Sequence, residues 1–232
     1  NSLNGVDLEQ LRRRFELGFD GTAREHWDFG SSWRHENRDG NKSFGAVIGN
    51  NGGNPRAVLI PEPIDYSSDD FDAVMSFRDQ KKQFSLAYHA SLFDNNQGSF
   101  GWENPYNSIN GWTPVVVGFP NGEGQASGPP ENQFHQVSAA GGWNFSGTMR
   151  LDGDLAYGRM TQDDDYLPYT INPNLVTDGL PRGNLDGKVK VNRADLTISM
   201  RPINRLRVRG ALAWDQRKND TPQDFYTSIV HT

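Results

Sequence analysis

A stretch near the C-terminal end of the chain reads Leu206-Arg207-Val208-Arg209-Gly210-Ala211-Leu212-Ala213-Trp214. Apolar side chains occupy positions 206, 208, 212 and 214, while the odd positions between them hold arginine or alanine. A repeat of two residues is the period of a β-strand whose two faces differ. The stretch therefore predicts a strand with one apolar face and one face of charged or small residues.

Seven further stretches share this period, at 15–19, 27–33, 71–77, 84–92, 137–145, 149–157 and 194–200. The connections between them alternate in length. Short turns are expected around Asp20-Gly21 and at 79–81, 146–147 and 202–204, and long loops at 39–70, 94–132 and 162–187. Short periplasmic turns and long extracellular loops are typical of outer-membrane barrels. The sequence thus predicts an all-β fold, an antiparallel up-and-down transmembrane β-barrel segment of about eight strands.

Composition excludes several classes of protein. The chain has 232 residues, a formal net charge of −6 and no cysteine. Without cysteine it can form no disulfide, use no thiol nucleophile, bind no zinc through sulfur and attach no c-type haem covalently. The acidic balance argues against nucleic-acid binding, which needs a basic face. No apolar run approaches the roughly 20 residues of a membrane helix.

The aromatic residues that alternate onto the apolar faces of these strands fall into two groups. Near the short turns lie Phe19, Trp27, Phe77, Phe84, Trp143 and Phe145, and near the long loops lie Trp33, Phe71, Tyr88, Phe134, Tyr157 and Trp214. Mostly aliphatic residues separate the groups. Two aromatic girdles around an aliphatic band indicate a face turned to lipid. The residues Trp27, Trp33, Tyr88, Trp143, Tyr157 and Trp214 are therefore predicted to lie at the lipid interface.

The residues on the opposite face of the strands are predicted to line a lumen. They include charges of both signs and many glycine, serine and alanine residues. A soluble β-sandwich with the aromatic face as its core is the alternative. Greek-key connections, however, do not account for the regular asymmetry of the turns.

Candidate metal and catalytic residues are few. The acidic loop residues Asp163, Asp164, Asp165, Asp178 and Asp186 could bind Ca²⁺, but their spacing is not that of an EF-hand, and a solvated outer loop is the favoured interpretation. The same interpretation applies to Asp65, Asp69, Asp70 and Asp72 at the end of the first predicted loop. The histidines are scattered, and no catalytic arrangement is recognisable, so neither a metal site nor an enzyme is expected.

Several loop and strand-end motifs resemble one family. They are Ile60-Pro-Glu-Pro-Ile-Asp-Tyr66, Tyr88-His-Ala-Ser-Leu-Phe-Asp-Asn95, Ala156-Tyr-Gly-Arg-Met-Thr-Gln-Asp-Asp164, Leu167-Pro-Tyr-Thr-Ile-Asn-Pro173, Leu180-Pro-Arg182 and Leu185-Asp-Gly-Lys188. The chain from about Phe15 to Pro222 resembles the MtrB/PioB family of decahaem-associated outer-membrane barrels. The resemblance implies localisation in the bacterial outer membrane. It also implies that residues 1–232 are one segment of a larger barrel, with both ends truncated, which agrees with a start at Asn1 rather than Met.

The resemblance further implies a function. Such a barrel sheathes a periplasmic decahaem c-type cytochrome, so that electrons cross the outer membrane, often to an outer-surface multihaem cytochrome. Haem would be carried by the partner, with none bound covalently here. The residues then expected to face the cytochrome are Gly30, Ser32, Ser85, His89, Gly142, Ala156, Arg207, Arg209 and Ala211. Two other functions stay open: a diffusion porin for small solutes, and a soluble extracellular β-sandwich that binds glycans.

Overall fold

The computed structural model describes residues 5–51, 54–103, 123–171 and 176–227. These residues form ten strands: β1 (Gln10–Arg24), β2 (Trp27–Asn51), β3 (Asn54–Arg78), β4 (Lys82–Asn95), β5 (Ser99–Glu103), β6 (Glu123–Ser127), β7 (Asn132–Ser146), β8 (Met149–Gln162), β9 (Gly187–Ile203) and β10 (Leu206–Asn219). Eight of them make one sheet in the order β1-β2-β3-β4-β7-β8-β9-β10, and β5 pairs with β6. Among the described residues, no helix is long and apolar enough to cross a membrane.

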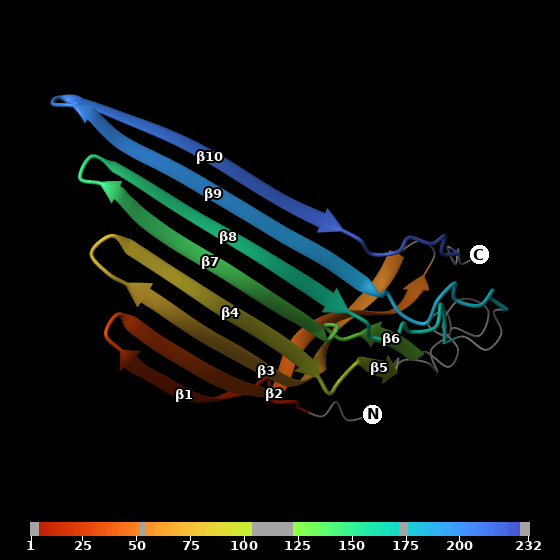
Figure 1. Ribbon diagram of the computed structural model, residues 1–232. Helices are drawn as coiled ribbons and strands as arrows, with labels where there is room; N and C mark the ends of the chain where they lie inside the picture. Colours follow the sequence, from red (N-terminus) through yellow and green to blue (C-terminus); the bar gives the residue numbers. More distant parts are fainter. Residues whose placement is uncertain (1–4, 52–53, 104–122, 172–175, 228–232) are drawn as a thin grey trace.

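The large sheet is antiparallel throughout, and its strands follow one another in chain order apart from the β5–β6 excursion. Tight turns lie at one end of the sheet and the longer connections at the other (Figure 1). This arrangement confirms the predicted all-β, antiparallel, up-and-down fold. Strands β1 and β10 form the two edges of the described sheet.

The first tight turn lies further along the chain than predicted. Asp20 and Gly21 belong to β1, where they pair with Gly30 and Phe29, and the turn is made at 25–26. Pairing continues past the Asp-Gly pair because Thr22 still finds a partner, its hydroxyl donating to Asp28 Oδ1 at 2.8 Å. In the β3–β4 turn, Asp79 Oδ1 accepts hydrogen bonds from the backbone N–H groups of Lys81 and Lys82, which lowers the pKa of the Asp79 carboxyl.

The two faces of the sheet differ as the alternation predicts. On one face, which we call the apolar face, Leu86 lies between Met75 on β3 and Ala139 on β7. On the other, the polar face, Ser85 lies between Ser76 and Ala140. The apolar face is uncovered by any second layer of the described chain, and the large hydrophobic residues that it exposes far outnumber the four buried ones. A face of this kind is the reverse of a soluble sandwich, in which it would be the core.

Strands β2 and β3 correct the prediction of a long loop at 39–70. The pairing that starts at Trp27 and Phe77 continues to Asn51 and Asn54, so most of the predicted loop is a β-hairpin. The acidic residues Asp65, Asp69, Asp70 and Asp72 consequently lie within β3. Within the extended hairpin Gly40 has a φ of +130°, and a Cβ there would collide with the carbonyl oxygen of Glu9. Only glycine fits such a position.

A small buried cluster forms at the loop end. Phe44 of the extended hairpin packs edge-on against Phe100 of β5, with ring centroids 4.9 Å apart, and Ala46 and Ile64 of the same hairpin are also buried. Lys42 pairs with the buried carboxylate of Glu62 at 2.8 Å. The predicted loop at 94–132 thus includes the β5–β6 hairpin, while its residues 104–122 lie outside the described residues.

Phe134 was predicted in the outer aromatic girdle, and the register shows that this was wrong. Phe134 pairs with Ser91 and Met160, whereas His135 occupies the parity of the apolar face. The Phe134 ring instead lies 5.9 Å from the ring of His89 on the polar face. Its height along the strand suits the girdle, but its parity places it on the other side of the sheet.

Candidate functional site

The polar face of the sheet carries a row of short side chains across five strands. Register pairs Gly30 with Val74, Val74 with Ala87, Ala87 with Ser138 and Ser138 with Ala156. We call these five residues the short-side-chain belt. With neighbouring strands about 4.8 Å apart, the belt extends across about 19 Å of the sheet. Nothing longer than a valine projects from the polar face along this line.

A hollow of about 530 Å³ opens beside the belt. Its lining includes the short residues Gly18, Gly30, Ser32, Ala87 and Ser138, together with the longer polar residues Asp20, Asp72, His89 and Gln136. Where the side chains are short, a body pressed against the sheet could approach the backbone itself. The belt is bounded at its two ends by charges, since Asp20 pairs with Gly30 and Arg193 pairs with Ala156.

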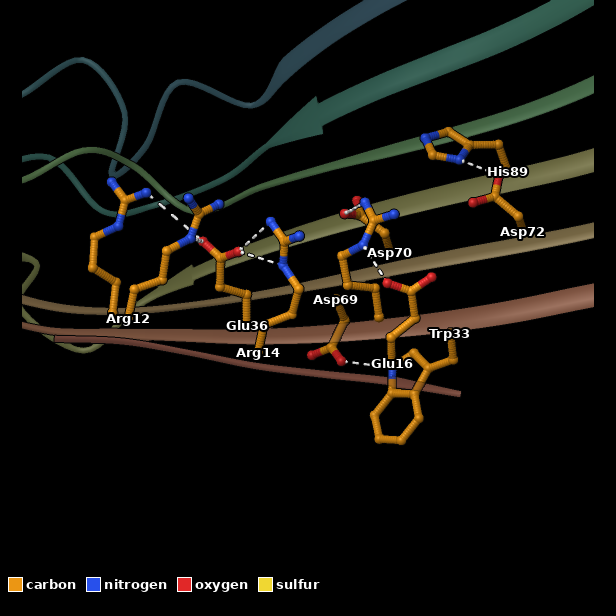
Figure 2. A network of polar contacts seen from close by, with 11 residues as sticks. Arg12, Arg14, Glu16, Trp33, Glu36, Asp69, Asp70, Asp72 and His89 are labelled. Carbon is orange, nitrogen blue, oxygen red and sulfur yellow. Dashed lines mark hydrogen bonds and ion pairs between the residues drawn. The ribbon is translucent and has the colours of Figure 1, made fainter. Parts of the chain in front are cut away.

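On the loop side of the belt, charged residues neutralise one another across β1, β2 and β3. Glu36 accepts from Arg12 at 2.6 Å and from Arg14 at 3.2 Å. Figure 2 shows Arg12 and Arg14 converging on Glu36. Arg34 forms ion pairs with the carboxylates of Glu16 and Asp70, each at 3.6 Å. The loop side of the polar face is therefore charged but largely compensated.

His89 lies at the margin of the belt, where its Nδ1 is 2.8 Å from Asp72 Oδ1. This contact occupies one ring nitrogen of the imidazole. His89 is thus held by β3 rather than projecting freely from β4.

Ion pairs also occupy the turn side of the polar face. Arg150 binds Asp152 at 2.6 Å, and Arg193 binds Asp195 at 2.6 Å and approaches Asp154 at 4.0 Å. Asp154 and Asp195 face each other across β8 and β9, so Arg193 offsets a repulsion between like charges. Exposed pairs of this kind contribute little to stability, and their main effect here is to fix where the long side chains lie.

The register places most of the predicted cytochrome-facing residues on this one face: Gly30, Ser32, Ser85, His89, Gly142, Ala156, Arg209 and Ala211. Gly30 and Ala156 lie in the belt itself, and Ser85 lies in the next row. Arg207 falls in an irregularity of the β9–β10 register and has no pairing partner. The contact of these residues with a cytochrome stays a prediction.

The six predicted interface aromatics, Trp27, Trp33, Tyr88, Trp143, Tyr157 and Trp214, have the parity of the apolar face. Polar partners that the sequence did not reveal hold two of them. Trp33 Nε1 donates to Asp69 Oδ1 at 2.8 Å, and the hydroxyl of Tyr88 is 2.8 Å from His135 Nδ1. In Figure 2 Trp33 and Asp69 project to the opposite side of the strands from Arg12 and Glu36. An aromatic ring with a bonded polar tip suits the boundary between lipid and water.

The predicted acidic loop is held by hydrogen bonds and an ion pair. Asp164 accepts a hydrogen bond from the backbone N–H of Glu131 at 2.7 Å, and Asp186 pairs with Lys188 at 2.7 Å. In the part of the chain that the structure describes, no group of three or more histidine, aspartate and glutamate residues is placed to hold a metal ion.

Comparison with known protein sequences adds two findings. The family model for outer-membrane β-barrel porins of the MtrB/PioB type matches residues 1–232. The outer membrane protein MtrB of Shewanella baltica (strain OS185) is 28% identical over 233 residues, which make up 99% of this chain and 30% of that protein. The chain therefore spans less than a third of the length of this relative.

Two solved structures are also similar. The in-vitro folded outer membrane protein OmpT of Vibrio cholerae has a TM-score of 0.37 and 8% identity, over 88% of this chain and 54% of that one. The loop L8 deletion mutant of the same protein gives the same TM-score and identity over 57% of its chain.

Proposed function

Because this chain belongs to the MtrB/PioB family of outer-membrane β-barrel porins, we propose that its strands line a barrel which sheathes a periplasmic multihaem c-type cytochrome. The strands β1–β4 and β7–β10 form part of an outer-membrane barrel wall, with the apolar face towards lipid. The polar face is then directed to the lumen. The cytochrome would carry haem into the barrel, and electrons would cross the outer membrane through it.

The short-side-chain belt is the observation that carries this proposal. A water-filled pore has no need of a smooth lining, because water and small solutes adapt to any side chain. A folded protein inserted against the wall gains by close contact, since dispersion and the exclusion of water depend on matched surfaces. The belt, about 19 Å wide, offers such a surface on five adjacent strands.

The ion pairs beside the belt support the same assignment. Exposed arginines such as Arg34 and Arg193 already have carboxylate partners on the wall. At these arginines a partner can therefore approach without having to neutralise isolated charges, whose burial is costly. The absence of cysteine agrees with a segment that attaches no c-type haem covalently.

The test uses the full-length protein and fills the belt from within. Ala87, Ser138 and Ala156 are replaced by Trp, which places three large rings on the polar face of β4, β7 and β8. Gly142 is a poor choice, because a Cβ there would be 2.5 Å from Arg150 Nη2 and would disturb the Arg150–Asp152 pair. The control replaces Ala73, Ala139 and Ala194, which lie on the apolar face, by Trp.

Haem that co-purifies with the barrel, and reduction of an external acceptor by intact cells, are measured together. Overpacking costs about 1–3 kcal/mol per site, so the inward triple variant should weaken cytochrome retention by at least about 100-fold. The control should retain haem, since rings on the apolar face meet lipid.

Two results would overturn the proposal. One is undiminished haem and electron flux in a folded inward variant. The other is a wild-type barrel that never binds haem but passes small sugars into liposomes, which would establish the porin function instead.

A further inference from the structure

Three basic residues lie side by side on the apolar face at its loop end. Register pairs Arg159 of β8 with Lys190 of β9, and Lys190 with Lys218 of β10. We call these three residues the cation row. On β7, His135 pairs with Arg159 and continues the line, although its Nδ1 is held by Tyr88. Like charges directly opposite one another destabilise a sheet, so the row calls for an explanation.

Only part of this charge is compensated. Asp220, just past the end of β10, binds Lys190 Nζ and Lys218 Nζ at 2.8 Å each. The two ammonium groups lower the pKa of the Asp220 carboxyl to about 2. Arg159 is exposed and has no hydrogen bond or ion pair with any residue that the structure describes. The row and Asp220 together therefore carry a net charge of +2.

The height of the cation row places it just outside the hydrocarbon. Tyr157 precedes Arg159 by two residues on the same face of β8, and two residues advance a strand by about 6.6 Å. With strands tilted by about 45°, Arg159 lies about 5 Å further out than the tyrosine ring, which marks the headgroup level. Cations at that depth meet the charged groups of lipid headgroups.

The turn end of the same three strands is different. There Met149 pairs with Met200, and Met200 pairs with Val208, also on the apolar face. An apolar row at one membrane boundary and a cationic row at the other make the lipid-facing surface of β8–β10 asymmetric. The cations lie on the side of the long loops, which in outer-membrane barrels is the outer leaflet.

We propose that Arg159, Lys190 and Lys218 form a docking site for the phosphate groups of a phosphorylated glycolipid in the outer leaflet. The outermost cations are two strand spacings apart, about 10 Å, which suits a headgroup with more than one phosphate better than a single small anion. Phosphate oxygens accept strong hydrogen bonds from guanidinium and ammonium groups. Binding there also relieves the repulsion among the three cations.

The experiment titrates the full-length protein, purified in detergent, with bis-phosphorylated lipid A and counts bound lipid by native mass spectrometry. Arg159→Gln combined with Lys218→Gln removes the net charge of +2 and keeps the neutral Lys190–Asp220 pair. Each cation near an anionic headgroup contributes about fivefold to affinity, so this variant should bind lipid A about 25- to 30-fold more weakly. The control, Arg150→Gln with Arg193→Gln, loses the same charge from the polar face and should bind lipid A as the wild type does.

A second measurement needs no variant. Dephosphorylated lipid A keeps the acyl chains, and the wild-type protein should bind it as weakly as the double variant binds lipid A. Equal binding of the phosphorylated and dephosphorylated forms, or an unchanged affinity in the folded double variant, would overturn the proposal. Phosphatidylglycerol bound as tightly as lipid A would also overturn it, because the site would then be a general one for phospholipids.

Discussion

Leu86 provides the sharpest test of which face meets lipid. It lies on β4 between two aromatic residues of the same face, Phe84 and Tyr88, and 40% of its surface is exposed. Its cross-strand neighbours are Met75 and Ala139, so the register offers no carboxylate to a new cation on this face. Arginine near the bilayer midplane costs about 2–4 kcal/mol, and Leu86→Arg should therefore reduce the folding equilibrium constant about 30- to 1,000-fold.

The matched control is the adjacent residue. Ser85 points to the polar face, where Asp154 lies one strand beyond its neighbour Ala140. An arginine at 85 can reach water and that carboxylate, so Ser85→Arg should cost less than about 1 kcal/mol. Reversible guanidinium unfolding of the full-length protein in lipid vesicles, followed by tryptophan fluorescence, measures both variants. Equal destabilisation, or a larger effect at 85, would refute the assignment of faces.

Two further predictions concern orientation and ionisation. An epitope tag at Asp178 should be accessible to antibody on intact cells, and a tag at Gly147 only after the outer membrane is opened, since turns are periplasmic; the opposite labelling would invert the topology. Because the folded-state pKa of Asp220 is lowered to about 2, its ion pairs should persist in the folded protein until the pH reaches about 2. The stability that they contribute is complete above the unfolded value of about 3.9 and should be lost progressively as the pH falls from there through about 2. The ¹³C carboxyl shift of Asp220 measures this titration, and Lys218→Ala should raise the midpoint; a midpoint near 3.9 in the wild type would contradict the ion-pair geometry.

The sequence predicts strands well only where lipid makes their two faces different. Within that band, alternation located the eight strands of the sheet and their faces. Between Asp39 and Asp70 the apolar residues of the β2–β3 hairpin are not confined to one face, because they come in continuous runs such as 57–60, separated by polar stretches. The period of two therefore disappears although the backbone pairing continues. The long loop predicted there was wrong for this reason. The turn at Asp20-Gly21 was wrong because a favourable turn pair competes with cross-strand contacts that the sequence does not show.

The candidate site could be predicted in kind but not in arrangement. Parity alone assigns Ala87 and Ala156 to the polar face, whereas their alignment in one belt follows from the pairing of β4 with β7 and of β7 with β8. The same holds for Arg159, Lys190 and Lys218, which are far apart in sequence and adjacent only in register. Phe134 shows the converse error, since its height was used without its parity.

The extended hairpin of β2 and β3 also bears on the order in which the chain folds. Its two strands are separated by only two residues, so pairing can start at Asn51 and Asn54 and proceed rung by rung towards Trp27 and Phe77. Each new pair of residues closes almost no additional loop, so it costs little chain entropy, and local contacts of this kind form quickly. The pairing of β4 with β7, by contrast, must first close the segment from Asn95 to Asn132. We therefore expect β2 and β3 to pair early in folding, and the remaining strands to pair with this hairpin afterwards.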